Sequence, residues 1–247
     1  MALAIAHRGD PFGHRENTIP AVLAAIEQGA DLVEIDVTST RDGAVILLHD
    51  ATLTRLWGHD GAVAELSADA VRAICRDDPY EIPTFDRVMA VSSATGRGLM
   101  VDLTVSRVAS RAAEIVAEHD GFDRAVFAGP TDGLLEIRRQ WPQARIALTW
   151  TRLEPPDPDL LAVLQPEFFN PNWCLIDRQT VDRMHANGYR VSAWTVDSPS
   201  NMARLLAMGV DAIITNRLRH LLTVRAHTSG YLAHPARPSR PVEETVT

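Results

Sequence analysis

Residues 3–37 read LAIAHRGDPFGHRENTIPAVLAAIEQGADLVEIDV, and this stretch decides the fold class. The apolar run 3–6 is typical of a short strand, and residues 17–28 space their apolar side chains at helical intervals. Gly29 ends the helical pattern, and a second apolar strand follows at 32–37. A strand, a helix and a strand in this order predict two parallel strands joined by a crossing helix.

The same alternation continues along the chain. We expect further strands at 99–103, 125–127, 144–148, 168–170, 189–196 and 211–215, and helices at 66–74, 84–92, 108–118, 133–140, 159–164, 178–186 and 199–208. Setting the short run 44–48 aside leaves eight strands, each followed by a helical segment. This predicts an α/β fold, a TIM (β/α)8 barrel in a single domain spanning residues 1–226. Residues 227–247 are rich in Pro and Arg without periodicity, and we expect a C-terminal tail.

Composition excludes several classes of function. No apolar run in the 247 residues approaches the roughly 20 residues that a membrane span needs. The formal net charge of −8 argues against nucleic acid as a partner and against broad binding to anionic membranes. Cys75 and Cys174 are far apart in the sequence, and we recognise no signal peptide, so we expect reduced thiols in a cytoplasmic protein. The oligomeric state is not indicated.

All 24 Lys and Arg side chains are arginines, because the sequence contains no lysine. Base composition of the genome is the simplest explanation. The absence nevertheless excludes Schiff-base and lysine-base chemistry. An anionic substrate must therefore be held by Arg, by a protonated His or by a metal ion.

Carboxylates mark the end of the second strand, and barrel enzymes place their active sites at the C-terminal ends of strands. Glu34 and Asp36 are two residues apart, so their side chains share one face of the strand. They would be solvated if that face pointed outward, but apolar neighbours on the strand disfavour this alternative. Two carboxylates inside a barrel require a cation, and an all-oxygen site suits Mg²⁺ or Ca²⁺.

Two histidines each end an extended run, His7 after the first strand and His49 after the run 44–48. Either alone would most simply be a hydrogen-bonded structural residue. Together at equivalent strand ends, near a metal ion, they are candidates for the acid and base of catalysis. Arg8 offers a planar cation for an anionic group.

Several short segments together carry a further signal. They are AHRG at 6–9, ENT at 16–18, GAD at 29–31, EIDV at 34–37, DG at 42–43, HD at 49–50, IPT at 82–84, WTV at 194–196 and GVDAIIT at 209–215. In this order and spacing the chain resembles the glycerophosphodiester phosphodiesterase family, from about residue 4 to about residue 218.

The resemblance implies a TIM barrel with one divalent cation, Mg²⁺ or Ca²⁺, that hydrolyses a small phosphodiester to an alcohol and a phosphomonoester. The site residues it implies are the metal ligands Glu34 and Asp36, the acid and base His7 and His49, the phosphate-binding Arg8, the active-site carboxylate Glu16 and the aromatic wall Trp194. Which histidine is the acid stays open.

The chain also departs from the family pattern. The family usually has a Glu-x-Lys pair on the third strand, where this chain has Asp102 and Thr104. Asp102 keeps a third, shorter carboxylate for the metal, whereas Thr104 lacks a cation that would face the phosphate. Arg15 stands in place of the usual Pro, and either replaces the missing charge in substrate binding or points to solvent. Arg8 and Arg55 are the other arginines that could supply this charge, unless the substrate differs from the usual one of the family. Asn216 and Arg217 stand in place of Asp-Pro.

Two alternatives to hydrolysis stay open. Relatives of the phospholipase D type on this fold attack the phosphate with a substrate hydroxyl and release a cyclic phosphate. The changes on the third strand are also compatible with a binding homologue of weak activity. Against this second alternative, both histidines, the Glu34 and Asp36 pair and Arg8 are all present.

Overall fold

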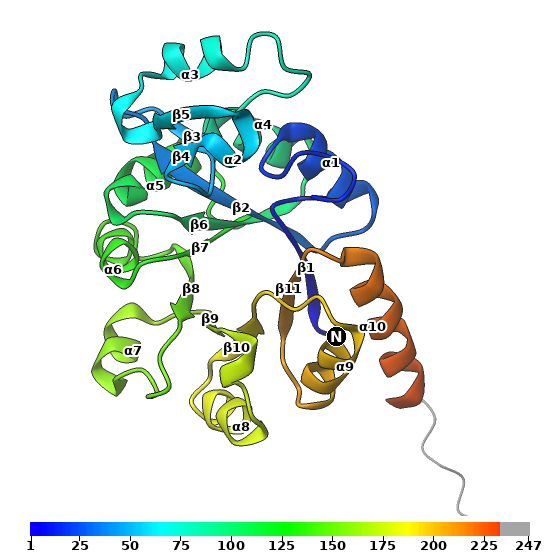
Figure 1. Cartoon of the computed structure of the whole chain (residues 1–247). Helices are drawn as coiled ribbons and strands as arrows, with labels where there is room; N and C mark the ends of the chain where they lie inside the picture. Colours follow the sequence, from blue (N-terminus) through cyan, green and yellow to red (C-terminus); the bar gives the residue numbers. More distant parts are fainter. Residues whose placement is uncertain (233–247) are drawn as a thin grey trace, which may run out of the picture.

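A computed structural model describes residues 1–232 and shows a closed barrel of eight parallel strands (Figure 1). Around the ring the strands are β1 (Leu3–His7), β2 (Leu32–Ser39), β6 (Gly98–Leu103), β7 (Ala125–Ala128), β8 (Arg145–Trp150), β9 (Phe168–Pro171), β10 (Arg190–Ala193) and β11 (Ala212–Thr215). Pairing of β11 with β1 closes the ring. The predicted TIM barrel is therefore confirmed, and the run set aside from the count is β3 (Val45–Leu47), which pairs antiparallel with β2.

Helices surround the strands on the outside of the barrel (Figure 1). They are α1 (Ile19–Glu27), α4 (Phe85–Thr95), α5 (Ala109–Glu118), α6 (Thr131–Gln140), α7 (Pro158–Leu164), α8 (Arg178–Ala186) and α9 (Pro199–Ala207). Local sequence sets their ends. At α1 the Thr18 side chain accepts a hydrogen bond from the N–H of Ala21, and Pro20 fits the first turn. Gly29 follows with φ of +95°, a left-handed conformation that glycine adopts without strain.

Two layers of apolar side chains form the core. The larger includes Val33 and Ile35 and lies between the strands and the helices, whereas the smaller fills the barrel and includes Ile5, Leu32 and Met100. Because side chains alternate along a strand, positions two and four residues beyond these three also face the interior. The interior therefore becomes polar towards the carboxyl ends of β1, β2 and β6, at His7, Glu34, Asp36 and Asp102.

A small excursion separates β3 from α4. It consists of β4 (Thr52–Leu53), α2 (Thr54–Trp57), β5 (His59–Ala62), η1 (Val63–Glu65) and α3 (Ala68–Ile74). The strands β4 and β5 pair antiparallel as a separate two-stranded sheet that the sequence pattern did not predict. Short 3₁₀ turns occur elsewhere as η2 (Ser106–Val108) and η3 (Trp173–Leu175).

The last described element is α10 (Leu218–Leu232), which follows β11 and contacts α9 and β1. Its bounds were not predicted, and it extends beyond residue 226, where we expect the domain to end. The remainder of the expected tail, residues 233–247, lies outside the described residues. Among residues 1–232, none of the helices has the length and apolar character that a membrane crossing requires.

Candidate active site

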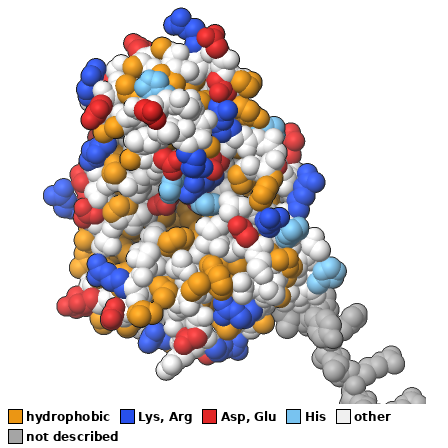
Figure 2. Space-filling model, viewed as in Figure 1, with side chains coloured by type: hydrophobic (Ala, Val, Ile, Leu, Met, Phe, Trp, Pro, Cys, Tyr) orange, Lys and Arg blue, Asp and Glu red, His pale blue; other side chains and the backbone are white. Residues whose placement is uncertain are grey.

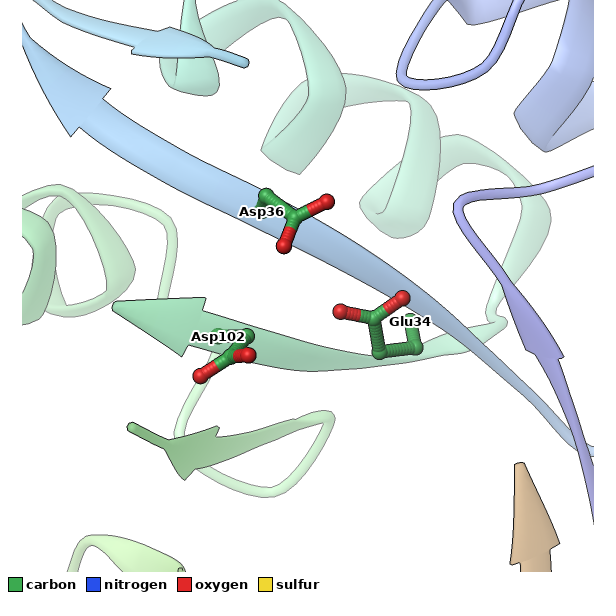
Figure 3. A group of neighbouring side chains, drawn as sticks. All are labelled: Glu34, Asp36 and Asp102. Carbon is green, nitrogen blue, oxygen red and sulfur yellow. The ribbon is translucent and has the colours of Figure 1, made fainter. Parts of the chain in front are cut away.

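Strand register brings three carboxylates together at the mouth of the barrel. In the parallel pairing of β2 with β6, Asp36 is the partner of Asp102 and Glu34 is the partner of Met100. Oxygen atoms of Glu34, Asp36 and Asp102 lie within 4.8 Å of one another, and Figure 3 shows the three side chains on the two neighbouring strands. Glu34 and Asp36 are 4% and 1% exposed, so both face the interior, as their spacing predicts.

The charges in this acidic cluster are poorly compensated by the protein. Burial, together with the charges of Asp36 and Asp102, raises the pKa of Glu34 well above its ordinary value. Burial and the charge of Asp36 raise the pKa of Asp102 to about 7. The cation that opposes both shifts is Arg8. A divalent cation bound by all three carboxylates would relieve their repulsion, and oxygen ligands of this kind fit Mg²⁺ or Ca²⁺.

Arg8 connects the acidic cluster to Glu16. Its backbone N–H donates to Oε2 of Glu34 at 2.9 Å, and its NH1 donates to Oε1 of Glu16 at 2.8 Å. Its Nε lies 3.0 Å from Oδ2 of Asp36, an ion-pair contact without hydrogen-bond alignment. Arg8 has φ of +58°, a conformation that non-glycine residues adopt rarely and often at functional sites.

Asn17 binds Asp36 through two reciprocal hydrogen bonds. Its Nδ2 donates to Oδ2 of Asp36 at 2.7 Å, and the backbone N–H of Asp36 donates to Oδ1 of Asn17 at 3.1 Å. Asn17 is 2% exposed and also has a positive φ, +58°. Its own backbone N–H donates to the carbonyl of Arg8. The loop between β1 and α1 therefore sets the orientation of the Asp36 carboxylate.

A chain of ion pairs runs from Glu16 to His49. Arg55 donates from NH2 to Glu16 at 2.7 Å and from Nε to Oδ2 of Asp50 at 2.6 Å. The other oxygen of Asp50 lies 2.8 Å from Nδ1 of His49. The hydrogen bond from Arg55, with a further contribution from His49, lowers the pKa of Asp50 to about 2. Asp50 is thus an anion that accepts the Nδ1 proton of His49, which leaves Nε2 of His49 for chemistry.

Glu16 is held by both arginines of this chain. Burial by itself would raise the pKa of Glu16, but hydrogen bonds from Arg55 and Arg8 outweigh it and lower that pKa. Glu16 does not belong to the group of oxygens within 4.8 Å of one another. In this arrangement it positions Arg8 and Arg55.

His7 lies at the end of a second hydrogen-bonded chain. Its Nδ1 is 2.7 Å from Oδ1 of Asn216, and Asn216 donates to Asp197 from both its side-chain Nδ2 and its backbone N–H. Because a carboxylate accepts N–H donors, the amide nitrogen faces Asp197 and the amide oxygen faces His7. His7 therefore carries its proton on Nδ1, and its Nε2 lies 3.9 Å from Glu34. Burial, and then the charge of Arg8, lowers the pKa of His7.

Two cavities meet at the acidic cluster, and Asp102 lines both. The larger has a volume of about 530 Å³ and is also lined by Asp36 and His49. The smaller has a volume of about 60 Å³ and is also lined by Glu34 and His7. Figure 2 shows acidic, basic and histidine side chains gathered around a hollow over the barrel mouth.

Two further candidates line these cavities. Trp194 borders the smaller one, where its Nε1–H donates to the carbonyl of Asn170 at 2.9 Å and so fixes the indole ring. Thr104 borders the larger one, and its hydroxyl donates to the carbonyl of Val37 at 3.1 Å.

Arg15 lies elsewhere, and its place corrects both alternatives considered for it. Its NH1 donates to Asp78 at 2.8 Å, and its guanidinium lies over the rings of Trp57 and Tyr80 at 4.3 and 5.2 Å. It lines neither cavity of the site. Arg15 therefore ties the β1–α1 loop to the excursion before α4, since a guanidinium that is both paired and stacked is not free to bind substrate.

Several residues that complete the site were not among the candidates: Asn17, Asp50, Asp197 and Asn216. Two of them carry a signal in the sequence, since Asp50 adjoins His49 and Asn216 directly follows the last strand. The others lie in loops, where no periodic pattern predicts which way a side chain points.

Known proteins resemble this chain over most of its length. The model of the glycerophosphoryl diester phosphodiesterase family matches residues 7–220. A glycerophosphodiester phosphodiesterase from Caldanaerobacter subterraneus subsp. tengcongensis is 27% identical over 234 residues, which cover 87% of this chain and 93% of that protein. Another, from Bacillus altitudinis, is 25% identical over 234 residues, which cover 87% of this chain and 95% of that protein.

Solved structures share the fold. A phosphodiesterase from Oleispira antarctica, in complex with the product sn-glycerol-3-phosphate, has a TM-score of 0.83 at 24% identity, over 90% of this chain and 96% of that one. A glycerophosphodiester phosphodiesterase from Thermotoga maritima has a TM-score of 0.74 at 19% identity, over 92% of this chain and 99% of that one. Since the family model spans most of the sequence and the barrel is shared, the chain belongs to the glycerophosphoryl diester phosphodiesterase family and is a phosphoric diester hydrolase.

Proposed function

We propose that this chain hydrolyses a glycerophosphodiester to an alcohol and a phosphomonoester with the help of one divalent cation. The observation that carries the proposal is the acidic cluster of Glu34, Asp36 and Asp102 with a histidine in each adjoining cavity. The three carboxylates would hold Mg²⁺ or Ca²⁺. When bound, such an ion supplies positive charge for the phosphate oxygens.

In this proposal Arg8 binds the phosphate. NH1 of Arg8 is engaged by Glu16, but its NH2 makes no hydrogen bond within residues 1–232. A second terminal nitrogen is thus left to donate to a phosphate oxygen. The ion pairs with Glu16 and Asp36 hold the guanidinium beside the acidic cluster, so the donor is oriented before the substrate arrives.

The surroundings of the two histidines support different roles. Burial and the charge of Arg8 lower the pKa of His7, which keeps its proton on Nδ1 towards Asn216, and its unprotonated Nε2 takes a proton from the attacking water. The water oxygen bonds to phosphorus, and the bond from phosphorus to the alcohol oxygen breaks. His49, whose positive charge in the protonated state is balanced by Asp50, gives its Nε2 proton to the departing alcohol oxygen. Exchange with solvent then restores both protonation states.

A direct assay tests this function. The purified chain is incubated with glycerophosphocholine or bis-p-nitrophenyl phosphate and Mg²⁺ or Ca²⁺, with Asp36→Asn as the matched inactive variant. We expect cleavage by the wild type that EDTA abolishes. Phosphorus NMR identifies the product: a phosphomonoester supports hydrolysis, whereas a persistent cyclic phosphate favours the phospholipase D type of reaction. Absence of cleavage of either substrate with either metal would reject the proposal.

A further inference from the structure

We propose that the larger cavity receives the alcohol part of the substrate, and that this alcohol is rich in hydroxyls and carries an additional negative charge that Arg152 binds. The inference rests on the proposed phosphodiesterase function and names the substrate class for it. It rests on the volumes of the two cavities, on the threonines of the larger cavity, and on Arg152, which lines that cavity without a partner acid.

The two cavities would each receive one of the two alcohol groups of a bound phosphodiester. Asp102 lines both cavities, so a phosphate at the acidic cluster lies at their junction. The smaller cavity, about 60 Å³, has room for a few water molecules and therefore for a short polyol such as glycerol. The second alcohol must then extend into the larger cavity, about 530 Å³, on the side of His49.

Four threonines are among the residues that line the larger cavity, Thr104, Thr131, Thr149 and Thr151. The hydroxyl of Thr149 accepts from the N–H of Gly129 at 3.1 Å, which leaves its own proton to donate. Within the described part of the chain, the hydroxyls of Thr131 and Thr151 make no hydrogen bond. The two unused hydroxyls of Thr131 and Thr151, together with the proton that Thr149 can donate, suit an alcohol that offers several hydroxyls in return, and they do not suit an acyl chain.

Among the residues that line the larger cavity, Arg152 is the arginine. The other arginines near the site are engaged, Arg8 and Arg55 by Glu16 and neighbouring acids, Arg15 by Asp78. Arg152 has no carboxylate within ion-pair distance among residues 1–232. Its guanidinium instead lies over the ring of Trp150, with Cζ 5.4 Å from the ring centroid.

Trp150 makes a fixed support for this arginine. The indole is 8% exposed, and its Nε1–H donates to the carbonyl of Glu154 at 2.8 Å, in the same loop. A guanidinium held over an aromatic ring without a partner acid is placed to bind a carboxylate or a phosphate. Binding of a quaternary ammonium group such as choline is disfavoured here, because the guanidinium repels it and covers part of the aromatic face that would attract it.

The test compares three substrates that share the glycerophosphate half. They are glycerophosphocholine (cationic alcohol), glycerophosphoinositol (neutral polyol) and glycerophosphoinositol 4-phosphate (polyol with a further anion). We expect kcat/KM to rise in that order for the wild type. Arg152→Glu should lower kcat/KM for the phosphorylated substrate by about tenfold, mainly through KM, because Arg152 binds the substrate away from the reacting phosphorus. The value for glycerophosphocholine should rise, because the substitution removes the cation that repels choline and uncovers the ring of Trp150.

The controls separate this inference from the function on which it rests. Arg72→Glu makes the same charge change on an exposed part of α3, paired with Asp69 and outside both cavities, and should leave the order of substrates unchanged. Arg152→Lys keeps the charge and should keep most of the preference. Cleavage of all three substrates with equal kcat/KM, or a preference that Arg152→Glu leaves intact, would overturn the inference while the phosphodiesterase function stands. Failure to cleave any of them would overturn both.

Discussion

Asp36 and Asp102 are register partners on the neighbouring parallel strands β2 and β6, and their carboxylates share one space at the barrel mouth. Glu34 joins them from the same face of β2. Packing does not require acids here, since the positions before them on the same face, Leu32 and Met100, are apolar. Three acids with one opposing arginine destabilise the barrel mouth, and a bound cation would reverse that effect.

Loss of one of these carboxylates should weaken metal binding. Asp102→Asn removes a ligand and a negative charge, and we expect the affinity for Mg²⁺ or Ca²⁺ to fall by about tenfold or more. Isothermal titration calorimetry of chelator-treated protein measures this change. Asp182→Asn is the matched control, because Asp182 pairs with Arg178 on the exposed side of α8. Equal affinity of the Asp102 variant and the wild type would contradict the assignment of Asp102 as a ligand.

The contribution of Asp102 and Glu34 to the stability of the metal-free protein should fall as pH rises from about 4 to about 7. Asp102 has its pKa raised from 3.8 to about 7 by burial and by Asp36, and the shift of Glu34 has the same direction. Between these values the native state binds more protons than the unfolded chain, so the free energy of unfolding decreases with increasing pH. Saturating metal should remove the decrease, because the ion binds the deprotonated carboxylates.

Urea unfolding at pH 5 and pH 7.5, with and without Mg²⁺, checks this pH dependence. Asp102→Asn serves as the control, since it cannot take up the proton and should show a smaller change between the two pH values. If the free energy of unfolding of the metal-free wild type rises between pH 5 and pH 7.5, and rises more than that of the Asp102 variant, the raised pKa values are wrong.

The barrel and its acidic strand ends could be predicted because the signals for them are local. Alternation along a strand places Glu34 and Asp36 on one face whatever the rest of the chain does. The helices follow from apolar spacing and from end signals such as Gly29, which lies directly after the predicted helix 17–28. Such local signals are missing from the short strands β4 and β5 and are weak in α10, where polar and apolar side chains are not clearly separated.

The hydrogen-bonded support of the site could not be predicted, because it joins residues far apart in the sequence. His7 and Asn216 are 209 positions apart, and Arg15 and Asp78 are 63 apart. The expected placement of Arg15 failed for this reason: its partner and its two stacking rings come from the excursion before α4. The position of Arg152 at the larger cavity depends likewise on the conformation of the β8–α7 loop.

Asn17→Ala should destabilise the protein by about 1–3 kcal/mol. The substitution leaves the buried N–H of Asp36 without its acceptor and puts alanine at a positive φ. The freed Asp36 carboxylate should also bind metal less well. Denaturant unfolding measures the first effect and calorimetry the second. Asn187→Ala, which removes an exposed hydrogen bond to the carbonyl of Arg183, should cost less; a comparable loss for both would argue against a special role of Asn17.

His49→Ala should lose activity to a degree that depends on the leaving group. If His49 protonates the departing alcohol, its loss should slow glycerophosphocholine hydrolysis by about 10²- to 10⁴-fold. A p-nitrophenyl phosphodiester releases a stable phenolate that needs little protonation, so its cleavage should slow much less. His7→Ala removes the base and should slow both reactions alike. The His49 side chain is 46% exposed, so unfolding measurements should show little change. His119→Ala, a surface histidine paired with Asp86, controls for the loss of an imidazole. Equal slowing of the two substrates by His49→Ala would show that His49 does not protonate the leaving alcohol.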